Sequence, residues 1–306
     1  MPPLTSLSAT QLATYAQIAQ AQATKGKVIG RIDPLASANP NELAVYICSE
    51  HHSSSYGNTA CRFPLMSVIK PFSLLFLLHH CGTDSVRQWV GMQPSDMPFN
   101  SLEQLRADQG FPRNPMINSG AIALADKLPG TTATERCTAL CQWLNQQANV
   151  TLDLDATVLT AVRQSDRSAN LALVDYLATC NVLHNPSLAL DTYEQICCLS
   201  GQVADLVQLG QLLAGTAQPV QPLLPQHRQI VNAVMLTCGL YAASGQYAVE
   251  IGLPLKSGIS GALLAVVPRQ GAIACYSPAL DDIGNPVAAL ALVQQLSQDL
   301  QLGVFS

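Results

Sequence analysis

The 306-residue chain has few charged residues: they make up 11% of the sequence, with 15 lysines and arginines against 20 aspartates and glutamates. The formal net charge is −5, and the basic residues do not form a run. A surface that binds nucleic acid or an anionic membrane concentrates positive charge. The composition therefore predicts neither a nucleic-acid partner nor a membrane partner.

The sequence also lacks a segment that could cross a membrane or direct export. No purely apolar run approaches the roughly 20 residues that a helical span needs. The N-terminal segment contains no basic stretch followed by an apolar core, so it does not have the pattern of a signal peptide. We therefore predict a cytoplasmic protein.

Cysteine is too rare for a disulfide scaffold, with ten residues in the whole chain. None of them forms a C-x-x-C pair, and no cysteine–histidine cluster has the spacing of a zinc site. We expect free and mostly buried thiols, and no metal site. The 48% of hydrophobic residues are enough for a large core.

Strand-like and helical patterns occupy different parts of the chain. Residues 8–11 have the spacing of a capping box and open a helical pattern that lasts to Gly26. Residues 43–48 and 61–63 flank a turn and predict a hairpin. Helical patterns dominate from residue 67 to about 200. Strand patterns return at 246–258, 261–268 and 271–278, and a last helix is predicted from about 284 to 300.

This order predicts one catalytic domain over residues 1–306. Its α/β part would take in about residues 1–66 and 230–306, and a helical part of about residues 67–229 would be inserted between them. The predicted class is α/β, with a sheet packed between helices.

The first candidate for chemistry is a Ser-x-x-Lys pattern at Ser67 and Lys70. Pro71 is tolerated only in the first turn of a helix, so a helix should begin at or just before Ser67. Lys70 then lies on the same helix face as the serine, where it can take the hydroxyl proton if it is neutral. On this pattern alone, a serine N-cap with a solvent-facing lysine remains the competing interpretation.

Two further motifs follow in order: Ser-x-Asn at residues 168–170 and Lys-Ser-Gly at residues 256–258. Together with Ser-x-x-Lys they are the signature of the penicillin-recognising serine enzymes. The glycine lets a substrate approach the strand backbone, whose N–H groups can stabilise an oxyanion. The three motifs therefore favour a serine acyl-transfer site.

Longer stretches are more specific than these short motifs. Residues 26–28, 99–122, 237–254 and 277–290 resemble the serine-dependent glutaminase family, and the likeness covers nearly the whole chain. The resemblance implies a serine β-lactamase-like fold: an antiparallel sheet flanked by N- and C-terminal helices, plus a helical subdomain. It also implies hydrolysis of L-glutamine to L-glutamate and ammonia through an acyl-serine, without a cofactor, by a homodimer or homotetramer.

The resemblance also implies roles for individual residues. Ser67 matches the nucleophile and Lys70 its activating partner. The other matches are two catalytic tyrosines and three substrate-binding residues: Tyr193, Tyr241, Asn118, Asn170 and Ile259, the last of which would present its backbone to the substrate.

The sequence departs from the family pattern at two places. Arg31 stands where the family has an active-site tyrosine; it cannot relay a proton near neutral pH, but it can hold a substrate carboxylate. Arg163 stands where the family has the glutamate thought to hold the α-ammonium of glutamine. A three-residue deletion would instead put Asp166 in that place, so we expect Asp166 to bind this group.

These departures leave two alternatives to a glutaminase. The first is a divergent serine amidohydrolase or acyltransferase that acts on a different amide. The second is a homologue that binds glutamine but has lost turnover. A penicillin-binding protein is less consistent with the sequence, because no export signal is found.

Overall fold

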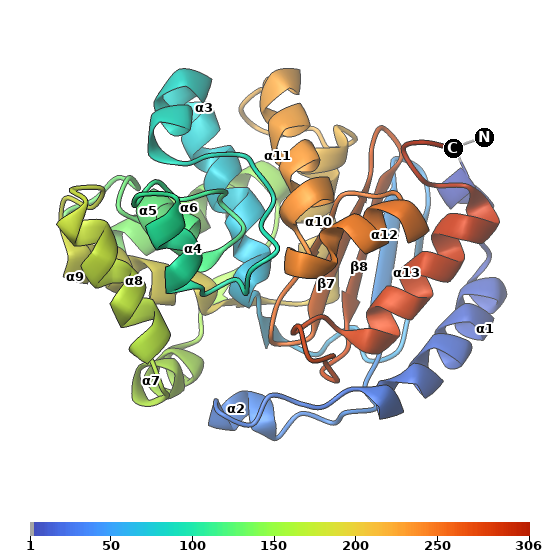
Figure 1. The fold of residues 1–306 in the computed structure, drawn as a ribbon. Helices are drawn as coiled ribbons and strands as arrows, with labels where there is room; N and C mark the ends of the chain where they lie inside the picture. The colour runs from blue at the N-terminus through green and yellow to red at the C-terminus, as the bar shows by residue number, and fades with distance from the viewer. Residues whose placement is uncertain (1–2) are drawn as a thin grey trace.

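The strands of the main sheet come from the two ends of the chain. The computed structural model describes residues 3–306, and its five-stranded antiparallel sheet has the order β2-β1-β8-β7-β6 (Figure 1). Its strands are β1 (Ala44–Ser49), β2 (Ser53–Tyr56), β6 (Leu255–Ser257), β7 (Ala262–Val267) and β8 (Gly271–Tyr276).

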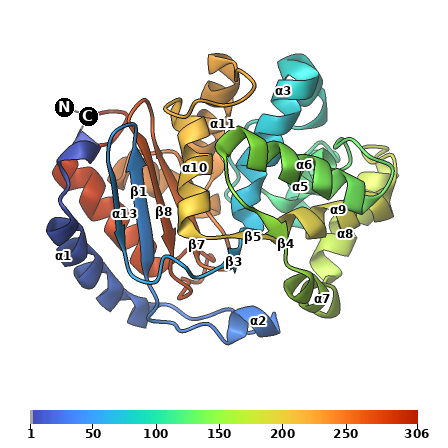
Figure 2. The same ribbon diagram turned by 180° about the vertical axis from the view of Figure 1, so that it is seen from behind.

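Helices cover both faces of this sheet. Helices α1 (Ala9–Gln20) and α13 (Val287–Leu300) lie on one face, and α10 (Val203–Ala214) lies on the other (Figures 1 and 2). The central strands β7 and β8 are therefore buried along their whole length and read as unbroken apolar runs. Alternate residues of β7 enter different cores: Leu263 packs toward α13, and Leu264 packs toward α10.

The remaining helices form a second region beside the sheet. A small sheet of order β3-β5-β4 lies within it and brings Phe63–Pro64 next to residues 199–201. Its elements are β3 (Phe63–Pro64), α3 (Lys70–Trp89), α4 (Leu102–Ala107), α5 (Asn118–Ala125), α6 (Ala133–Ala148), β4 (Asp153–Leu154), α7 (Ala156–Gln164), α8 (Ser168–Thr179), α9 (Pro186–Cys197), β5 (Leu199–Gly201) and α11 (Pro225–Cys238).

The predicted fold is confirmed in outline: an antiparallel sheet is flanked by N- and C-terminal helices, with many helices in between. Ser8 caps α1 through the predicted capping box, and the last helix begins at Val287. The turns and short segments complete the chain: 3₁₀ helices over Pro3–Ser6, Ala21–Lys25, Met66–Ile69 and Tyr241–Ala243, with the short helices α2 (Asp33–Ala36) and α12 (Ser244–Glu250).

The predicted hairpin was wrong. Strand β1 pairs with β2 at Ser53–Tyr56, and residues 63–64 join the small sheet instead. Strand β2 reads Ser-Ser-Ser-Tyr and lies at the edge of the main sheet, where a strand needs no apolar pattern. Its sequence therefore gave no strand signal.

The strand predicted over residues 246–258 was also wrong for its first half. The segment Ser244–Glu250 is the helix α12, and strand β6 covers only Leu255–Ser257. Tyr247 and Ile251 pack on the core one helical turn apart, and Val249 between them faces solvent. Apolar residues at 247, 249 and 251 imitated the alternation of a strand.

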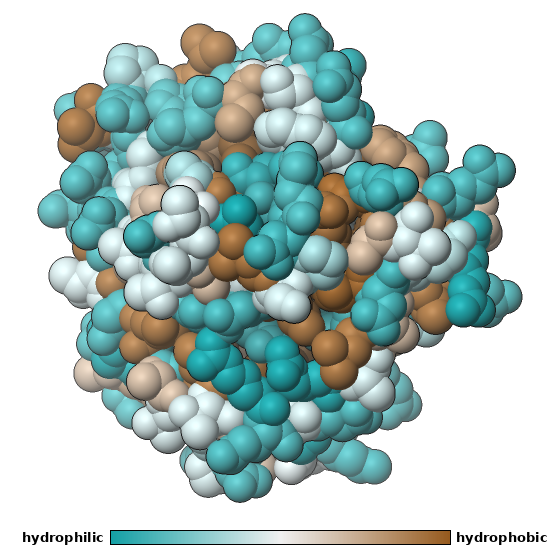
Figure 3. Space-filling view, turned by 90° about the vertical axis from the view of Figure 1, so that its left-hand side faces the viewer, coloured by the Kyte–Doolittle hydropathy of each residue, from teal (hydrophilic) through white to brown (hydrophobic). Residues whose placement is uncertain are grey.

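The helical region presents a mainly hydrophilic outer face. Figure 3 views the molecule from the side of α7, α8 and α9, where hydrophobic residues appear as small separate groups. Within residues 3–306, no helix is long and apolar enough to cross a membrane. Although α10 falls inside the range predicted as the helical part, it packs on the main sheet.

Candidate active site

Ser67 and Lys70 lie at the junction between the two regions. The segment Met66–Ile69 forms a 3₁₀ turn that leads directly into α3, with Pro71 in the first turn as expected. Side chains three residues apart eclipse in a 3₁₀ turn, so Lys70 and Ser67 share one side of it. The helix therefore begins where the sequence predicted.

The backbone next to the serine is held in a rare conformation. Met66 has φ +47°, in the left-handed region that non-glycine residues seldom adopt. Gly258, after strand β6, lies so close that a Cβ there would come 2.7 Å from the carbonyl oxygen of Leu65. The Lys-Ser-Gly strand thus packs directly against the segment that carries Ser67.

A chain of buried polar groups holds the lysine. The Nζ of Lys70 donates to the carbonyl oxygen of Met116 at 3.0 Å and to Oδ1 of Asn118 at 2.8 Å. The hydroxyl of Tyr193 donates to the same Oδ1 at 3.1 Å, and Nδ2 of Asn118 donates to Oδ1 of Asn170 at 2.9 Å. Three predicted site residues are therefore connected to Lys70.

Burial changes the protonation of these groups. Loss of solvent lowers the pKa of Lys70 to about 8, so a substantial share is neutral near physiological pH. The same cause raises the pKa of Tyr193 well above its usual value. The tyrosine therefore remains a hydrogen-bond donor while the lysine can exchange its proton.

Tyr241 lies beside the Lys-Ser-Gly strand. The Nζ of Lys256 lies 4.2 Å from the centre of its ring and donates to the carbonyl oxygens of Gly239 and Ser257 at 2.9 and 2.7 Å. Burial raises the pKa of Tyr241 to about 12, and the Ser67 hydroxyl opposes part of this rise. In the described part of the chain, the buried Tyr241 hydroxyl has no hydrogen-bond partner of good geometry, although the hydroxyls of Ser67 and Ser257 lie near enough to lower its pKa.

A cavity opens in front of Ser67, and we call it the inner cavity. It brings together most of the residues that the sequence predicted. Lys70 and Tyr241 are not among the residues that line it. The predicted residues that do line it are Ser67, Asn118, Asn170, Tyr193, Ile259 and Arg31.

A second cavity, here called the outer cavity, adjoins the first. It shares Arg31, Phe99, Asn118 and Asn170 with the inner cavity and adds Asp166. Asp166 is exposed and accepts a hydrogen bond from the backbone N–H of Ser168, so it does not line the inner cavity.

Arg163, the other departure from the family pattern, lines neither cavity. Its guanidinium forms an ion pair with Asp191 on α9, and both side chains are about 40% exposed. The arginine therefore does not place a positive charge in front of Ser67.

The residues that line the inner cavity but were not predicted from the sequence include the polar side chains of Glu194 and Cys197. Both belong to α9, which also carries Tyr193. Glu194 is 3% exposed and forms a bidentate ion pair with Arg167, with nitrogen–oxygen distances of 2.7 and 2.9 Å. No motif or spacing in the sequence indicated Glu194. Which residues of α9 face the cavity depends on how this helix packs, and the sequence does not show that.

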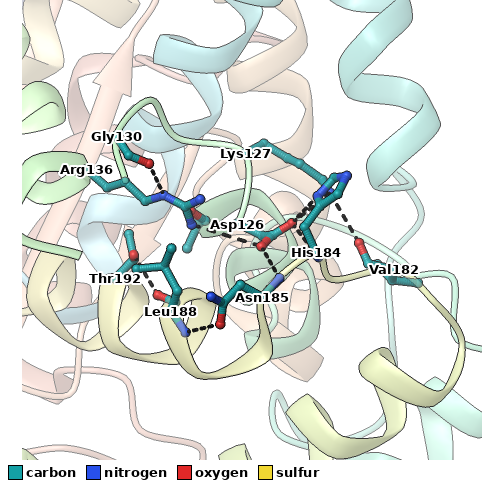
Figure 4. A network of polar contacts seen from close by, with 10 residues as sticks. Asp126, Lys127, Gly130, Arg136, Val182, His184, Asn185, Leu188 and Thr192 are labelled. Atoms are coloured by element: carbon teal, nitrogen blue, oxygen red, sulfur yellow. Dashed lines mark hydrogen bonds and ion pairs between the residues drawn. The ribbon is translucent and has the colours of Figure 1, made fainter. Parts of the chain in front are cut away.

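The start of α9 is fixed by a buried carboxylate. Asp126 accepts hydrogen bonds from the backbone N–H groups of His184 and Asn185 and from Nζ of Lys127 (Figure 4). The Asn185 side chain then caps α9 by accepting from the N–H of Leu188. This network anchors the helix that carries Tyr193 and Glu194.

The described part of the chain offers no cluster for a metal ion. Among residues 3–306, no group of three or more histidine, cysteine, aspartate or glutamate side chains could hold one. All ten cysteines are free, and five are buried.

Comparison with known proteins gives the family. A model of the family described as Glutaminase matches residues 26–305. The chain belongs to the glutaminase family. A glutaminase of Synechocystis sp. is 41% identical over 96% of this chain and 90% of that protein. Glutaminase 2 of Escherichia coli K12 is 33% identical over 92% and 93% of the two chains.

Solved glutaminase structures share the fold. A probable glutaminase of Bacillus subtilis superposes with a TM-score of 0.89 at 28% identity, covering 97% of both chains. Another B. subtilis structure, complexed with 6-diazo-5-oxo-L-norleucine, has a TM-score of 0.88 at 27% identity over 98% and 97% of the two chains. The predicted serine β-lactamase-like fold of this glutaminase is thereby confirmed.

Proposed function

We propose that Ser67 is the nucleophile with which this glutaminase hydrolyses L-glutamine to L-glutamate and ammonia. The observation that carries the proposal is the hydrogen-bonded group of Lys70, Asn118 and Tyr193 around the start of α3, with Ser67 facing the inner cavity. A B. subtilis glutaminase forms a covalent complex with 5-oxo-L-norleucine, which supports a nucleophile in this family.

In the first step, Ser67 Oγ attacks the side-chain carbonyl carbon of glutamine and its proton passes to neutral Lys70. The carbonyl oxygen becomes an oxyanion. The tetrahedral intermediate then collapses: the C–N bond breaks, and the nitrogen takes the proton from Lys70 and leaves as ammonia. The product of this step is a glutamyl ester of Ser67.

In the second step, water attacks the ester and gives its proton to Lys70. The bond to Ser67 breaks, the serine is protonated again, and glutamate leaves. Lys70 suits this exchange because its lowered pKa lets it hold and release a proton near neutral pH.

Two backbone N–H groups are available for the oxyanion. The amides of Ser67 and Ile259 have no hydrogen-bond acceptor among residues 3–306. Both residues line the inner cavity, where such donors stabilise developing negative charge. Ile259 therefore acts through its backbone in this proposal.

The two tyrosines act as hydrogen-bond donors through their protonated hydroxyls. Burial keeps the hydroxyls of Tyr193 and Tyr241 protonated. Tyr193 orients Asn118, which in turn holds Lys70. The unpartnered hydroxyl of Tyr241 can donate to the Ser67 oxygen when charge develops on it.

The other predicted residues hold the amino acid. Asn118 and Asn170 line both cavities and offer amide groups to the substrate. The guanidinium of Arg31 meets the α-carboxylate at the junction of the two cavities. Asp166 lies in the outer cavity near Arg31, where it can meet a positive group that enters.

The decisive experiment replaces Ser67 with alanine. We expect ammonia release from glutamine to fall by at least about 10³-fold, because the variant lacks the hydroxyl that forms the ester. Circular dichroism and thermal unfolding should match those of the wild type. Retention of more than a tenth of the activity in Ser67→Ala would show that the proposed nucleophile is wrong.

A cytoplasmic location and assembly into a homodimer or homotetramer complete the proposal. The likeness to the glutaminase family supports the second, and light scattering of the purified protein tests it.

A further inference from the structure

The inner cavity contains a single carboxylate. Of the residues that line it in the described chain, only Glu194 is acidic, and it shares the cavity with Ser67. A carboxylate that is 3% exposed pays a desolvation cost and is retained where a charge partner compensates for it. Arg167 is one such partner, but its side chain does not line the cavity.

The geometry of the ion pair leaves Glu194 able to bind a second cation. Nε of Arg167 donates to Oε1, and Nη2 donates to Oε2. Each carboxylate oxygen has two acceptor sites, so one site on each remains. Arg167 thus fixes the orientation of the carboxylate, and Glu194 also lines the inner cavity.

The alternative carboxylate lies in a different place. Asp166 is exposed, caps the backbone of Ser168 and lines only the outer cavity. Glutamine places its α-ammonium a short aliphatic chain away from the amide that Ser67 attacks. A carboxylate in the same cavity as Ser67 matches this distance better than one in the adjoining cavity.

We propose that Glu194, rather than Asp166, binds the α-ammonium group of glutamine and makes this enzyme select α-amino acid amides. This inference rests on the proposed role of Ser67, because it places the reacting amide in the inner cavity. Burial raises the pKa of Glu194, and an ammonium ion at the carboxylate would favour its ionised form.

The test compares glutamine with glutaramate, which is glutamine without its α-amino group. For the wild type we expect kcat/KM for glutamine to exceed that for glutaramate by about 10²-fold or more, because a buried carboxylate loses its partner with the second substrate. In Glu194→Gln we expect this preference to shrink to within about tenfold, through a loss for glutamine alone. A purely structural role would lower both values equally.

Asp153→Asn is the matched control. It removes a carboxylate and breaks the same kind of ion pair, that with Arg62, outside both cavities. Its substrate preference should equal that of the wild type. Asp166→Asn is the rival variant: collapse of the preference there, with the preference kept in Glu194→Gln, would overturn the proposal. An unchanged substrate preference in both Asp166→Asn and Glu194→Gln would also overturn the proposal.

Two further measurements keep the test decisive. If Glu194→Gln does not fold, Glu194→Asp is used, since it keeps the charge but withdraws it from the cavity: KM should rise about tenfold for glutamine and stay unchanged for glutaramate. Equal changes for both substrates would overturn the proposal.

Ser67→Ala is measured in parallel. If this variant keeps its activity, the proposed nucleophile is wrong. If it is inactive and Glu194→Gln keeps the wild-type preference, only the role of Glu194 is refuted.

Discussion

The inner and outer cavities of the site are built in different ways. At the inner end, Lys70, Asn118 and Tyr193 are buried and bonded to one another, so their positions are set before substrate arrives. At the outer end, Arg31 and Asp166 are exposed.

This difference follows the two tasks of the site. Proton transfer and oxyanion stabilisation require groups fixed in a dry environment, where their pKa values are shifted and their charges are little screened. Binding of the substrate's α-carboxylate at an open mouth tolerates mobile, solvated side chains. Changes to the proton-transfer groups at the inner end should therefore affect kcat, and changes at the outer end should affect mainly KM.

The largest effect is expected from Lys70→Met. Without a proton acceptor beside Ser67, kcat for glutamine should fall by about 10³-fold. Lys70→Arg keeps the charge but cannot release a proton, so it should not restore the rate. Steady-state ammonia release measures both variants. A Lys70→Arg enzyme with near-normal kcat would show that positive charge alone is sufficient at the inner end.

A smaller effect is expected from pH in the wild type. Below the pKa of Lys70, about 8, the amine carries a proton and cannot accept that of Ser67. We expect kcat/KM to rise about tenfold per pH unit up to that value and to level off above it. Initial rates between pH 6 and 9 would show this. A profile that is flat over this range would mean that Lys70 does not act as the base.

The smallest effect is expected at the outer end. In Arg31→Gln, KM for glutamine should rise about threefold and kcat should stay within about twofold, because an exposed ion pair contributes little free energy. Arg87→Gln is the control, since Arg87 is an exposed arginine on α3 outside both cavities. A large loss of kcat in Arg31→Gln would contradict the division between the two ends.

The inner end could be predicted from the sequence for a physical reason. Ser67 and Lys70 are three residues apart, and Pro71 limits where their helix can begin, so their relation is local. The link from Lys70 to Asn118 and Tyr193 came from the resemblance to a family, because no spacing rule joins residues so distant in the chain. The structure places all four together.

The outer end and α12 show where pattern reasoning fails. The sequence left open whether Arg163 or Asp166 takes the place of the family's glutamate. In the structure, Arg163 pairs with Asp191 and does not line the inner cavity. Residues 246–250 imitated a strand because their apolar spacing suits a short helix on a core equally well. Both cases depend on contacts between distant elements.

The sequence by itself determined the fold class and the family and indicated the segment of the proposed nucleophile, since these rest on local periodicity and on motifs that stay together along the chain. The tertiary structure alone decided which charges face Ser67. Glu194 on α9 is buried and lines the inner cavity, whereas Arg163 on α7 is partly exposed and forms an ion pair with Asp191. Burial and orientation arise from the packing of α7, α8 and α9, which no single segment specifies.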